Sequence, residues 1–286
     1  MAEAPPQPGP ATDAVSLSGF GLDDKLAELL DRGYVVVPDF ISQQEVARIR
    51  HAFETEVRVL PMAGGLGAKS PTVVRGHNLL AKTRAVDYLI LDPRLRAMVE
   101  GAIGKDVTIN IATLFNLLPG APRQPLHADD GLWPVPRPHP HFLCNAVIAI
   151  DDFDRENGAT HLVPYSHKWT HPVDQKVESL QVTMKSGSLL MWVGGMWHAG
   201  GANTSRDRER LALFISHNVG YLRQQENQVL SVPREVAAQM PRKLQRLLGY
   251  KGGVWQIDFR DHLDFLRDGQ VVHPDAKVAQ SGWCKL

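Results

Sequence analysis

The sequence predicts a mostly β protein, built as a β-sandwich or jelly-roll barrel that is braced by helices. The first observation is a central block, residues 106 to about 220, in which short β-branched or apolar runs are bounded by Gly, Pro and Asn-Gly. The second is that helical periodicity comes before and after this block. Because the chain has no repeat of solenoid or propeller length, one sheet-based core with flanking helices fits best.

The region before the central block contains three expected helices and one expected strand. Residues 22–33 and 92–104 carry apolar residues at helical spacing and end at a glycine. Ser42 begins the remaining helix, "SQQEVARIRHAFETEV", and the glutamate three residues later completes a capping box. We expect a strand in "YVVVPDF", residues 34–40, and a flexible loop in "PMAGGLGAKSPTV", residues 61–73.

The two ends of the chain differ in character. Residues 1–14 hold four prolines and few apolar residues, so we expect a disordered N-terminal tail. Residues 231–250 return to a helical pattern, with Pro233 near its start and Gly249 at its end. We therefore expect residues 15–286 to form a single domain.

Composition and charge restrict the expected class of partner. The chain has 286 residues, 43% of them hydrophobic, which is enough to fill a sizeable core. Lys and Arg number 31 and so do Asp and Glu, so no excess of positive charge favours nucleic acid or a membrane surface. Two cysteines suit a reducing compartment, and the N-terminus lacks the features of a signal peptide. These features favour a cytoplasmic protein, monomeric or homodimeric, with a small-molecule substrate.

The stretch "QPLHADDGLW" contains a candidate pair of metal ligands, His127 and Asp129. A His-x-acid triplet is expected about once by chance in a chain with 12 histidines and 31 acids, so the pair means little alone. It enters the β block, where residues i and i+2 point to the same face about 6.6 Å apart. Two further pairs are expected to be solvated surface pairs, because little sequence follows them: His262/Asp264 and His273/Asp275.

A third candidate ligand is His198, in "MWVGGMWHAGGAN", where an apolar run meets small residues that allow close backbone approach. Two histidines and one carboxylate form the ligand set of non-haem Fe(II) oxygenases. The same donors suit a hydrolytic zinc site, and any one histidine can instead be a hydrogen-bonded core residue. Residue types and spacing leave these alternatives open.

Five ordered motifs closely resemble the phytanoyl-CoA dioxygenase family of Fe(II)- and 2-oxoglutarate-dependent oxygenases. They are "LHADDGLWPVPRP", "IAIDDFDRENGATHLVPYSHKW", "GSLLMWVGGMWHAGGANTS", "RLALFIS" and "RQQENQVLSVPREV", and the likeness covers roughly residues 20–270. The resemblance implies a double-stranded β-helix (jelly-roll, cupin-like) core. It also implies Fe(II) bound by His127, Asp129 and His198, with 2-oxoglutarate and O2 as cosubstrates.

The resemblance implies residues for 2-oxoglutarate as well. The family's carboxylate-binding arginine falls on position 209, which is Glu here, so the role moves to Arg210 if the preceding loop carries one extra residue. Arginine suits this task because its planar fork offers paired hydrogen bonds to a carboxylate. Arg210 could alternatively pair with Glu209 or Asp207 on the surface. Three further cosubstrate contacts are expected from the resemblance, at Gln124, Thr160 and Asn116.

The implied activity is oxidation, most often hydroxylation, of a C–H bond in a small, largely hydrophobic organic molecule. Related halogenases replace the carboxylate ligand with a small residue, so Asp129 disfavours halogenation. No cluster of basic residues indicates a site for an acyl-CoA phosphate. Two alternatives stay open: a non-redox zinc hydrolase or isomerase, and a catalytically silent metabolite-binding homologue. Four residues are candidates for lining the substrate cavity: Asn78, Asp130, Trp133 and Met196.

Overall fold

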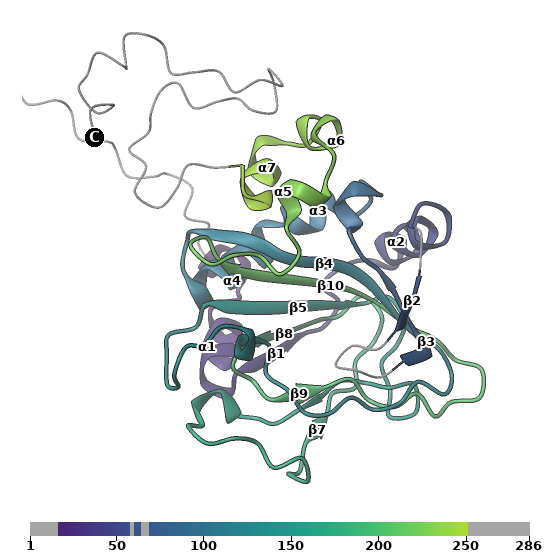
Figure 1. The fold of residues 1–286 in the computed structure, drawn as a ribbon, viewed down its shortest axis with the longest axis vertical. Coiled ribbons are helices and arrows are strands. Elements are labelled where there is room, and N and C mark those ends of the chain that lie inside the picture. The colour runs from purple at the N-terminus through teal and green to yellow at the C-terminus, as the bar shows by residue number, and fades with distance from the viewer. Residues whose placement is uncertain (1–16, 58–59, 64–68, 251–286) are drawn as a thin grey trace, which may run out of the picture.

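Two antiparallel sheets form the centre of the computed structural model, which describes residues 17–57, 60–63 and 69–250 (Figure 1). The larger sheet has the strand order β1-β8-β5-β10-β4-β3-β2, and the smaller has the order β7-β6-β9. The strands are β1 (Tyr34–Val37), β2 (Leu60–Ala63), β3 (Lys69–Gly76), β4 (Val107–Leu117), β5 (Leu143–Ala149), β6 (His161–Leu162), β7 (Leu180–Gln181), β8 (Leu189–Val193), β9 (His198–Ala199) and β10 (Arg210–Val219).

The smaller sheet is extended by isolated backbone bridges between loops. One joins His127 to His198, and others join Phe153 to Met184 and Asn157 to Asn203. An apolar cluster that includes Val147, Leu162, Leu190 and Trp192 packs on the inner face of the larger sheet. The result is a jelly-roll, double-stranded β-helix core, so the predicted fold class is confirmed.

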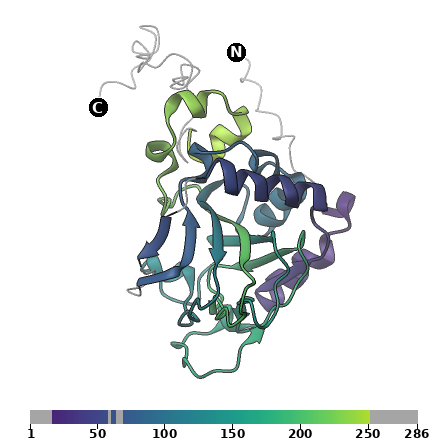
Figure 2. The same cartoon turned by 90° about the vertical axis from the view of Figure 1, so that its right-hand side faces the viewer.

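Helices cover the outer face of the larger sheet (Figure 2). The longer helices are α1 (Asp23–Arg32), α2 (Gln43–Thr55), α4 (Pro93–Ile103), α6 (Arg234–Ala238) and α7 (Arg242–Leu248). Two α-helices have a single turn, α3 (Asp87–Ile90) and α5 (Gln228–Ser231). The 3-10 helices are η1 (Leu17–Phe20), η3 (Leu79–Ala81), η4 (Asp129–Leu132) and η5 (Ser166–Lys168). None of the helices in the described ranges is long and apolar enough to cross a membrane.

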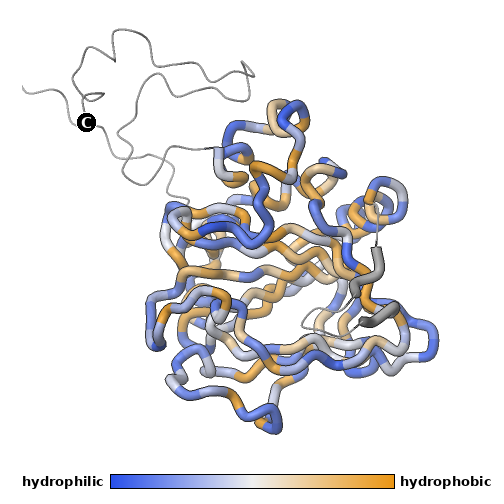
Figure 3. Tube along the Cα trace, in the orientation of Figure 1, coloured by the Kyte–Doolittle hydropathy of each residue, from blue (hydrophilic) through white to orange (hydrophobic). Residues whose placement is uncertain are grey.

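The two faces of strand β10 belong to different parts of the molecule, the core and a cavity. Its residues Leu211, Leu213 and Ile215 belong to the core beneath the helices, whereas Arg210, Ala212, Phe214 and Ser216 line a cavity on the opposite face. Successive side chains of a strand point to opposite faces, so one strand supplies both surfaces. With both faces covered, the central strands are hydrophobic along most of their length (Figure 3).

Most of the expected helices are present. α1 ends at Gly33, which has a left-handed φ of 85°, and α4 begins after the N-cap Asp92. The predicted capping box of α2 is confirmed, since Ser42 and Glu45 exchange both hydrogen bonds. The C-terminal helical pattern is divided into α6 and α7 at Pro241, which lies just before α7 and has no backbone N–H to donate.

The expected loop at residues 61–73 is wrong in part. Residues 60–63 form β2, and β3 begins at Lys69, so the sheet gains two strands ahead of the central block. Val73 and Val74 pair with Leu117 and Asn116 of β4. The sequence did not indicate these strands, because β3 is specified by its pairing with β4, and β2 by its pairing with β3, as well as by their own residues. The expected tail, the C-terminal pairs His262/Asp264 and His273/Asp275, and Cys284 lie outside the described residues.

Removing the α2 cap should lower stability without touching the cavity. The Ser42 hydroxyl accepts from the Glu45 backbone N–H, so Ser42→Ala leaves that N–H without its side-chain acceptor. We expect the free energy of unfolding to fall by about 1 kcal/mol. Urea denaturation of the two proteins measures the difference, and an unchanged midpoint would show that the cap contributes nothing.

Candidate metal centre

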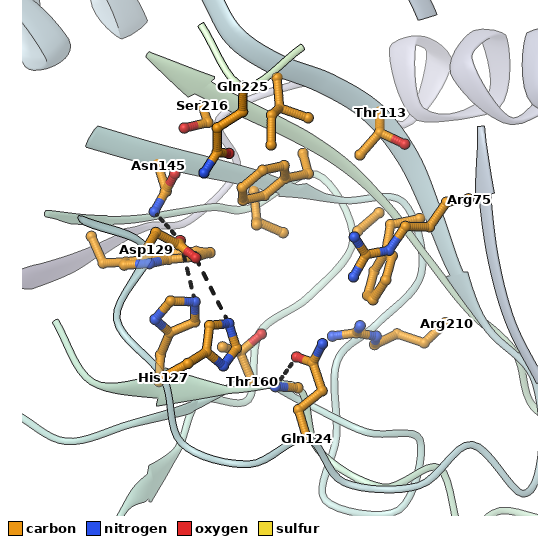
Figure 4. A pocket seen from close by; sticks show the side chains of 18 residues that line it. Arg75, Thr113, Gln124, His127, Asp129, Asn145, Thr160, Arg210, Ser216 and Gln225 are labelled. Carbon is orange, nitrogen blue, oxygen red and sulfur yellow. Dashed lines mark hydrogen bonds and ion pairs between the residues drawn. The ribbon is translucent and has the colours of Figure 1, made fainter. Parts of the chain in front are cut away.

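Three side chains converge where the two sheets approach. His127 and His198 exchange both backbone hydrogen bonds, at 2.9 and 2.8 Å, and their ring centroids lie 4.3 Å apart. Asp129 begins η4, two residues after His127. Its Oδ1 is 3.7 Å from Nε2 of His127, and its Oδ2 is 3.4 Å from Nε2 of His198. The potential metal-ligand atoms of all three residues lie within 4.8 Å of one another, so one metal ion could contact them all (Figure 4).

Hydrogen bonds fix which ring nitrogen faces this point. Nδ1 of His127 lies 2.9 Å from the carbonyl oxygen of Pro125, and Nδ1 of His198 lies 2.9 Å from that of Met196. A carbonyl only accepts, so each Nδ1 carries the proton and each Nε2 presents a lone pair. Burial is the main cause that lowers the pKa of His198, which favours its neutral form. Two lone pairs and a carboxylate therefore face one another, an arrangement that fits a bound cation.

Asn145 of β5 supports the carboxylate from behind. Its Nδ2 donates a hydrogen bond of 2.7 Å to Oδ2 of Asp129, and the residue is fully buried. This contact restrains the orientation of Asp129 relative to the two histidines. Hydrogen-bonded supports of this kind commonly hold metal-binding side chains in place.

A cavity of about 160 Å³ opens beside the three residues, and Arg210 forms part of its far wall (Figure 4). The guanidinium of Arg210 is 2% exposed, lies 4.4 Å from the ring centroid of Phe153, and has no partner for its Nε among the described residues. Burial lowers its pKa to about 9, against the opposing charge of Asp151, so the group stays cationic at neutral pH. The alternative surface pairing is not formed: Arg210 is buried, no ion pair joins it to Glu209 or Asp207 among the described residues, and Glu209 accepts from Asn116.

Arg75 of β3 is a second cation in the same cavity. Its Cζ lies 4.5 Å from the ring centroid of Phe115, which Arg210 also approaches, at 5.4 Å. Burial lowers the pKa of Arg75, and the charge of Asp129 opposes the change. Two largely desolvated guanidinium groups in one small cavity form a site suited to an anion.

Gln124 and Thr160, both expected contacts, line this cavity. Oε1 of Gln124 accepts a 2.7 Å hydrogen bond from the Gly200 backbone, so its amide nitrogen is the group left to donate. Figure 4 shows this nitrogen directed toward Arg210. The structure therefore brings six of the predicted residues to one cavity: His127, Asp129, His198, Arg210, Gln124 and Thr160.

Two residues that follow His198, Gly201 and Asn203, have clear structural roles. A Cβ on Gly201 would lie 2.4 Å from the carbonyl oxygen of Ala159, so only glycine fits this close approach. Nδ2 of Asn203 donates to the carbonyls of Leu117 and Arg208, at 3.0 and 2.7 Å. These contacts secure the loop that leads into β10, and they set where Arg210 enters the sheet.

Asn116 is not brought to the cavity. Phe115 lines the cavity, whereas the side chain of Asn116 lies on the opposite face of β4. There its Nδ2 donates a hydrogen bond of 2.7 Å to Glu209. Since side chains alternate along a strand, the neighbouring residues Phe115 and Asn116 must point to opposite faces. The stretch "LFNLLPG" alone did not indicate which face of the strand carries the Asn116 side chain.

The four expected cavity-lining residues also lie elsewhere in the structure. Asn78 donates from Nδ2 to the Ser231 carbonyl at 2.7 Å, and Trp133 packs edge-on against Phe142. Met196 is fully buried in the core of the inner sheet face. None of these three lines the cavity.

Asp130, the fourth, is committed to a buried ion pair. It lies 2.5 Å from Nη2 of Arg137 and 3.2 Å from Nε2 of His139. Its neighbour Asp129 faces the histidines instead, because the turn of η4 sends the two carboxylates in different directions.

Among the cavity residues that sequence reasoning missed are Arg75, Asn145, Ser216 and Gln225. Arg75 ends the run "SPTVVR", and its β-branched residues were the available signal for a strand. The other three carry no local signal, because strand pairing and the loop after β10 bring them together.

Comparisons with known proteins agree with this geometry. Residues 29–212 match the family model described as phytanoyl-CoA dioxygenase (PhyH), and the chain belongs to this family. The relative named dioxygenase swnH2, from Arthroderma benhamiae, is 30% identical over 92% of this chain and 92% of its own length. The multifunctional dioxygenase prhA of Penicillium brasilianum is 27% identical over 82% of this chain and 85% of its own.

Solved structures share the fold. HygX from Streptomyces hygroscopicus, determined with nickel, 2-oxoglutarate and hygromycin B bound, matches with a TM-score of 0.59 at 17% identity. The match covers 71% of this chain and 89% of HygX. Family membership and the His–Asp–His cluster together define the protein as a 2-oxoglutarate-dependent non-haem iron dioxygenase, with Fe(II) as its metal and O2 as the second cosubstrate.

Replacing Arg210 should stabilise the protein in the absence of ligands. Burial of this guanidinium without a direct carboxylate partner is unfavourable, whereas methionine fills a similar volume with apolar atoms. We expect Arg210→Met to raise the free energy of unfolding by about 1 kcal/mol or more. Urea denaturation of metal-free protein measures this, with the exposed Arg206→Met as control. A loss of stability in Arg210→Met would mean that the aromatic contacts outweigh desolvation.

Proposed function

We propose that the protein hydroxylates a C–H bond of a small organic molecule, with Fe(II) bound by His127, Asp129 and His198 and 2-oxoglutarate bound between the metal and Arg210. The observation that carries the proposal is that one cavity holds both a cluster of three acceptors and two arginines, Arg210 buried and Arg75 half-buried. A zinc hydrolase would need the same three ligands but would have no use for a desolvated arginine.

The protein ligands leave part of the metal's coordination sphere to other molecules. Three ligands on one side of a six-coordinate ion leave three positions, enough for a 2-oxo acid as a chelate and for O2. When bound, iron would couple reduction of O2 and oxidative decarboxylation of 2-oxoglutarate, to succinate and CO2, with oxidation of the substrate. The task of His127, Asp129 and His198 is to hold that ion in one place, and Asn145 keeps the carboxylate aligned.

Charge balance supports 2-oxoglutarate as the anion. A divalent ion, Arg75 and Arg210 together carry four positive charges, and Asp129 supplies one negative charge. A dianion reduces the excess of three to one, whereas an uncharged cosubstrate would leave it unchanged. Both arginines stay charged at neutral pH, and each offers paired hydrogen bonds that match a carboxylate.

The two arginines are assigned to different carboxylates. Arg210 lies at the far wall, so we assign it to the carboxylate remote from the metal, with the Gln124 amide beside it. Arg75 is the other cation of the lining, so we assign it to the remaining carboxylate, the one nearer the metal. Thr160, which is buried in the same lining, offers a hydroxyl to either.

The decisive test is succinate formation. Purified protein supplied with Fe(II), 2-oxoglutarate and O2 should release succinate slowly even without a substrate. His198→Ala should abolish this, because two ligands hold iron poorly. Arg210→Met should raise the 2-oxoglutarate concentration required by about 10- to 100-fold, as expected for lost charged hydrogen bonds. Arg206→Met serves as control. Iron-dependent succinate that is insensitive to both site variants would contradict the proposed ligands.

The assignment of the arginines predicts a difference in specificity. Pyruvate shares the 2-oxo acid group of 2-oxoglutarate but lacks the remote carboxylate. We expect Arg210→Met to lose the preference for 2-oxoglutarate over pyruvate, and Arg75→Met to weaken both ligands by a similar factor. Calorimetric titration of Ni(II)-loaded protein measures both affinities. The reverse pattern would exchange the two roles.

A further inference from the structure

A polar row lies in the cavity wall on the side away from the arginines. Asn145 of β5 and Ser216 of β10 are directly paired across the strands, and both line the cavity. Gln225, in the loop after β10, lies beside them (Figure 4). We call Asn145, Ser216 and Gln225 the polar row. The metal and cosubstrate, as proposed above, do not use the free hydrogen-bonding groups of this row.

The amide orientation of Asn145 is determined by its neighbour. The carboxylate of Asp129 only accepts, so the Asn145 amino group must face it, at 2.7 Å. The carbonyl oxygen Oδ1 is thereby left as an acceptor. It has no hydrogen-bond partner among the described residues, and Asn145 is 0% exposed. Because Asn145 lines the cavity, a donor on a bound molecule would satisfy this covered oxygen.

Backbone hydrogen bonding determines the orientation of Gln225 in the same way. The Gln225 backbone N–H donates to Oδ1 of Asn110 at 2.8 Å, so the amino group of Asn110 must be the donor on its other side. That amino group donates to Oε1 of Gln225 at 3.1 Å and to Oγ of Ser216 at 3.2 Å. The Gln225 amino group and the Ser216 hydroxyl proton therefore remain available. Figure 4 shows the Gln225 nitrogen directed into the cavity.

We propose that the polar row binds one uncharged substrate group that both donates and accepts a hydrogen bond, a hydroxyl or a secondary amide of a lactam. Its donor would meet Oδ1 of Asn145, and its acceptor would meet the Gln225 amino group or the Ser216 hydroxyl. The proposal rests on the proposed function and specifies its substrate class. No side chain of the row is ionised, so a charged group would lack a counter-ion there.

Apolar side chains next to the row fit the rest of such a substrate. Val147 lies two residues from Asn145 on β5, Phe214 two residues from Ser216 on β10, and Ile111 is the β4 partner of Ser216. Residues two apart share a face, so these three surround the polar groups with hydrocarbon. The expected substrate is an apolar molecule with one such polar group. A pure hydrocarbon would leave the row unsatisfied.

The cosubstrate leaves the row free. Ser216 and Arg210 are six residues apart on the same strand, which corresponds to roughly 20 Å along β10. Asn145 touches Asp129, so a molecule held by the row lies next to the metal centre. The row would then decide which C–H bond of the substrate faces the metal.

Matched pairs of small probes test the proposal. On protein loaded with Ni(II) and 2-oxoglutarate, ligand-observed NMR compares 2-piperidone with N-methyl-2-piperidone, and cyclohexanol with methoxycyclohexane. Each pair differs in the hydrogen-bond donor. We expect at least one pair to show a preference of about tenfold or more for the donor-bearing compound, because a site built for a hydrogen bond rejects analogues that lack it. A larger preference in the piperidone pair would indicate a lactam, and a larger preference in the cyclohexanol pair would indicate an alcohol.

Variants connect binding to the row. Gln225→Leu and Ser216→Ala each remove a partner of the probe's acceptor, so each should weaken binding of the preferred compound severalfold, and the exposed Gln239→Leu should not. The 2-oxoglutarate affinity of each protein is measured in parallel. If 2-oxoglutarate fails to bind the wild type, the proposed function fails. If it binds, and the probes do not bind at millimolar concentration, do not discriminate, or bind Gln225→Leu and Ser216→Ala as tightly as the wild type, the polar row does not recognise substrate.

Discussion

The structure around the cavity depends on the convergence of three hydrogen-bond acceptors. A hydrogen bond orients each of these side chains toward the other two. The two histidines donate to backbone carbonyls, and Asp129 accepts from the Asn145 amide. Such groups repel one another unless a cation lies between them, and the fold holds them in place regardless. The metal centre is therefore largely preorganised, so binding an ion requires little rearrangement of its ligands.

The buried Arg210 balances this centre at the other end of the cavity. It is held between aromatic rings, and none of the carboxylates in the described part of the chain contacts it directly, an arrangement that costs stability in the free protein. Such a cost is typical of binding sites that become complementary only when the ligand arrives. The hydrogen bonds of Asn203 in the loop before β10 keep the arginine in place.

The sheet assigns these tasks to separate parts of one surface. Along β10, Arg210, Phe214 and Ser216 present in turn a cation, an aromatic ring and a hydroxyl to the same cavity, while the alternate residues anchor the strand beneath the helices. Because side chains alternate along the strand, the cavity face of β10 can change in polarity from one end to the other while the opposite face stays packed in the core. Cosubstrate and substrate can occupy opposite ends because the strand is long enough to separate them.

The sequence by itself indicated the helices with their caps and the β-rich centre, and through the family resemblance it indicated the cluster of His127, Asp129 and His198 and the cavity arginine Arg210. Each is encoded within a short stretch or a motif of nearly constant spacing. Only the tertiary structure decided which side chains join them. Arg75 arrives through the pairing of β3 with β4, and the polar row through the pairing of β5 with β10. Asn116 turns away because a single step along a strand reverses the face, and only the pairing of the strands determines which face is which.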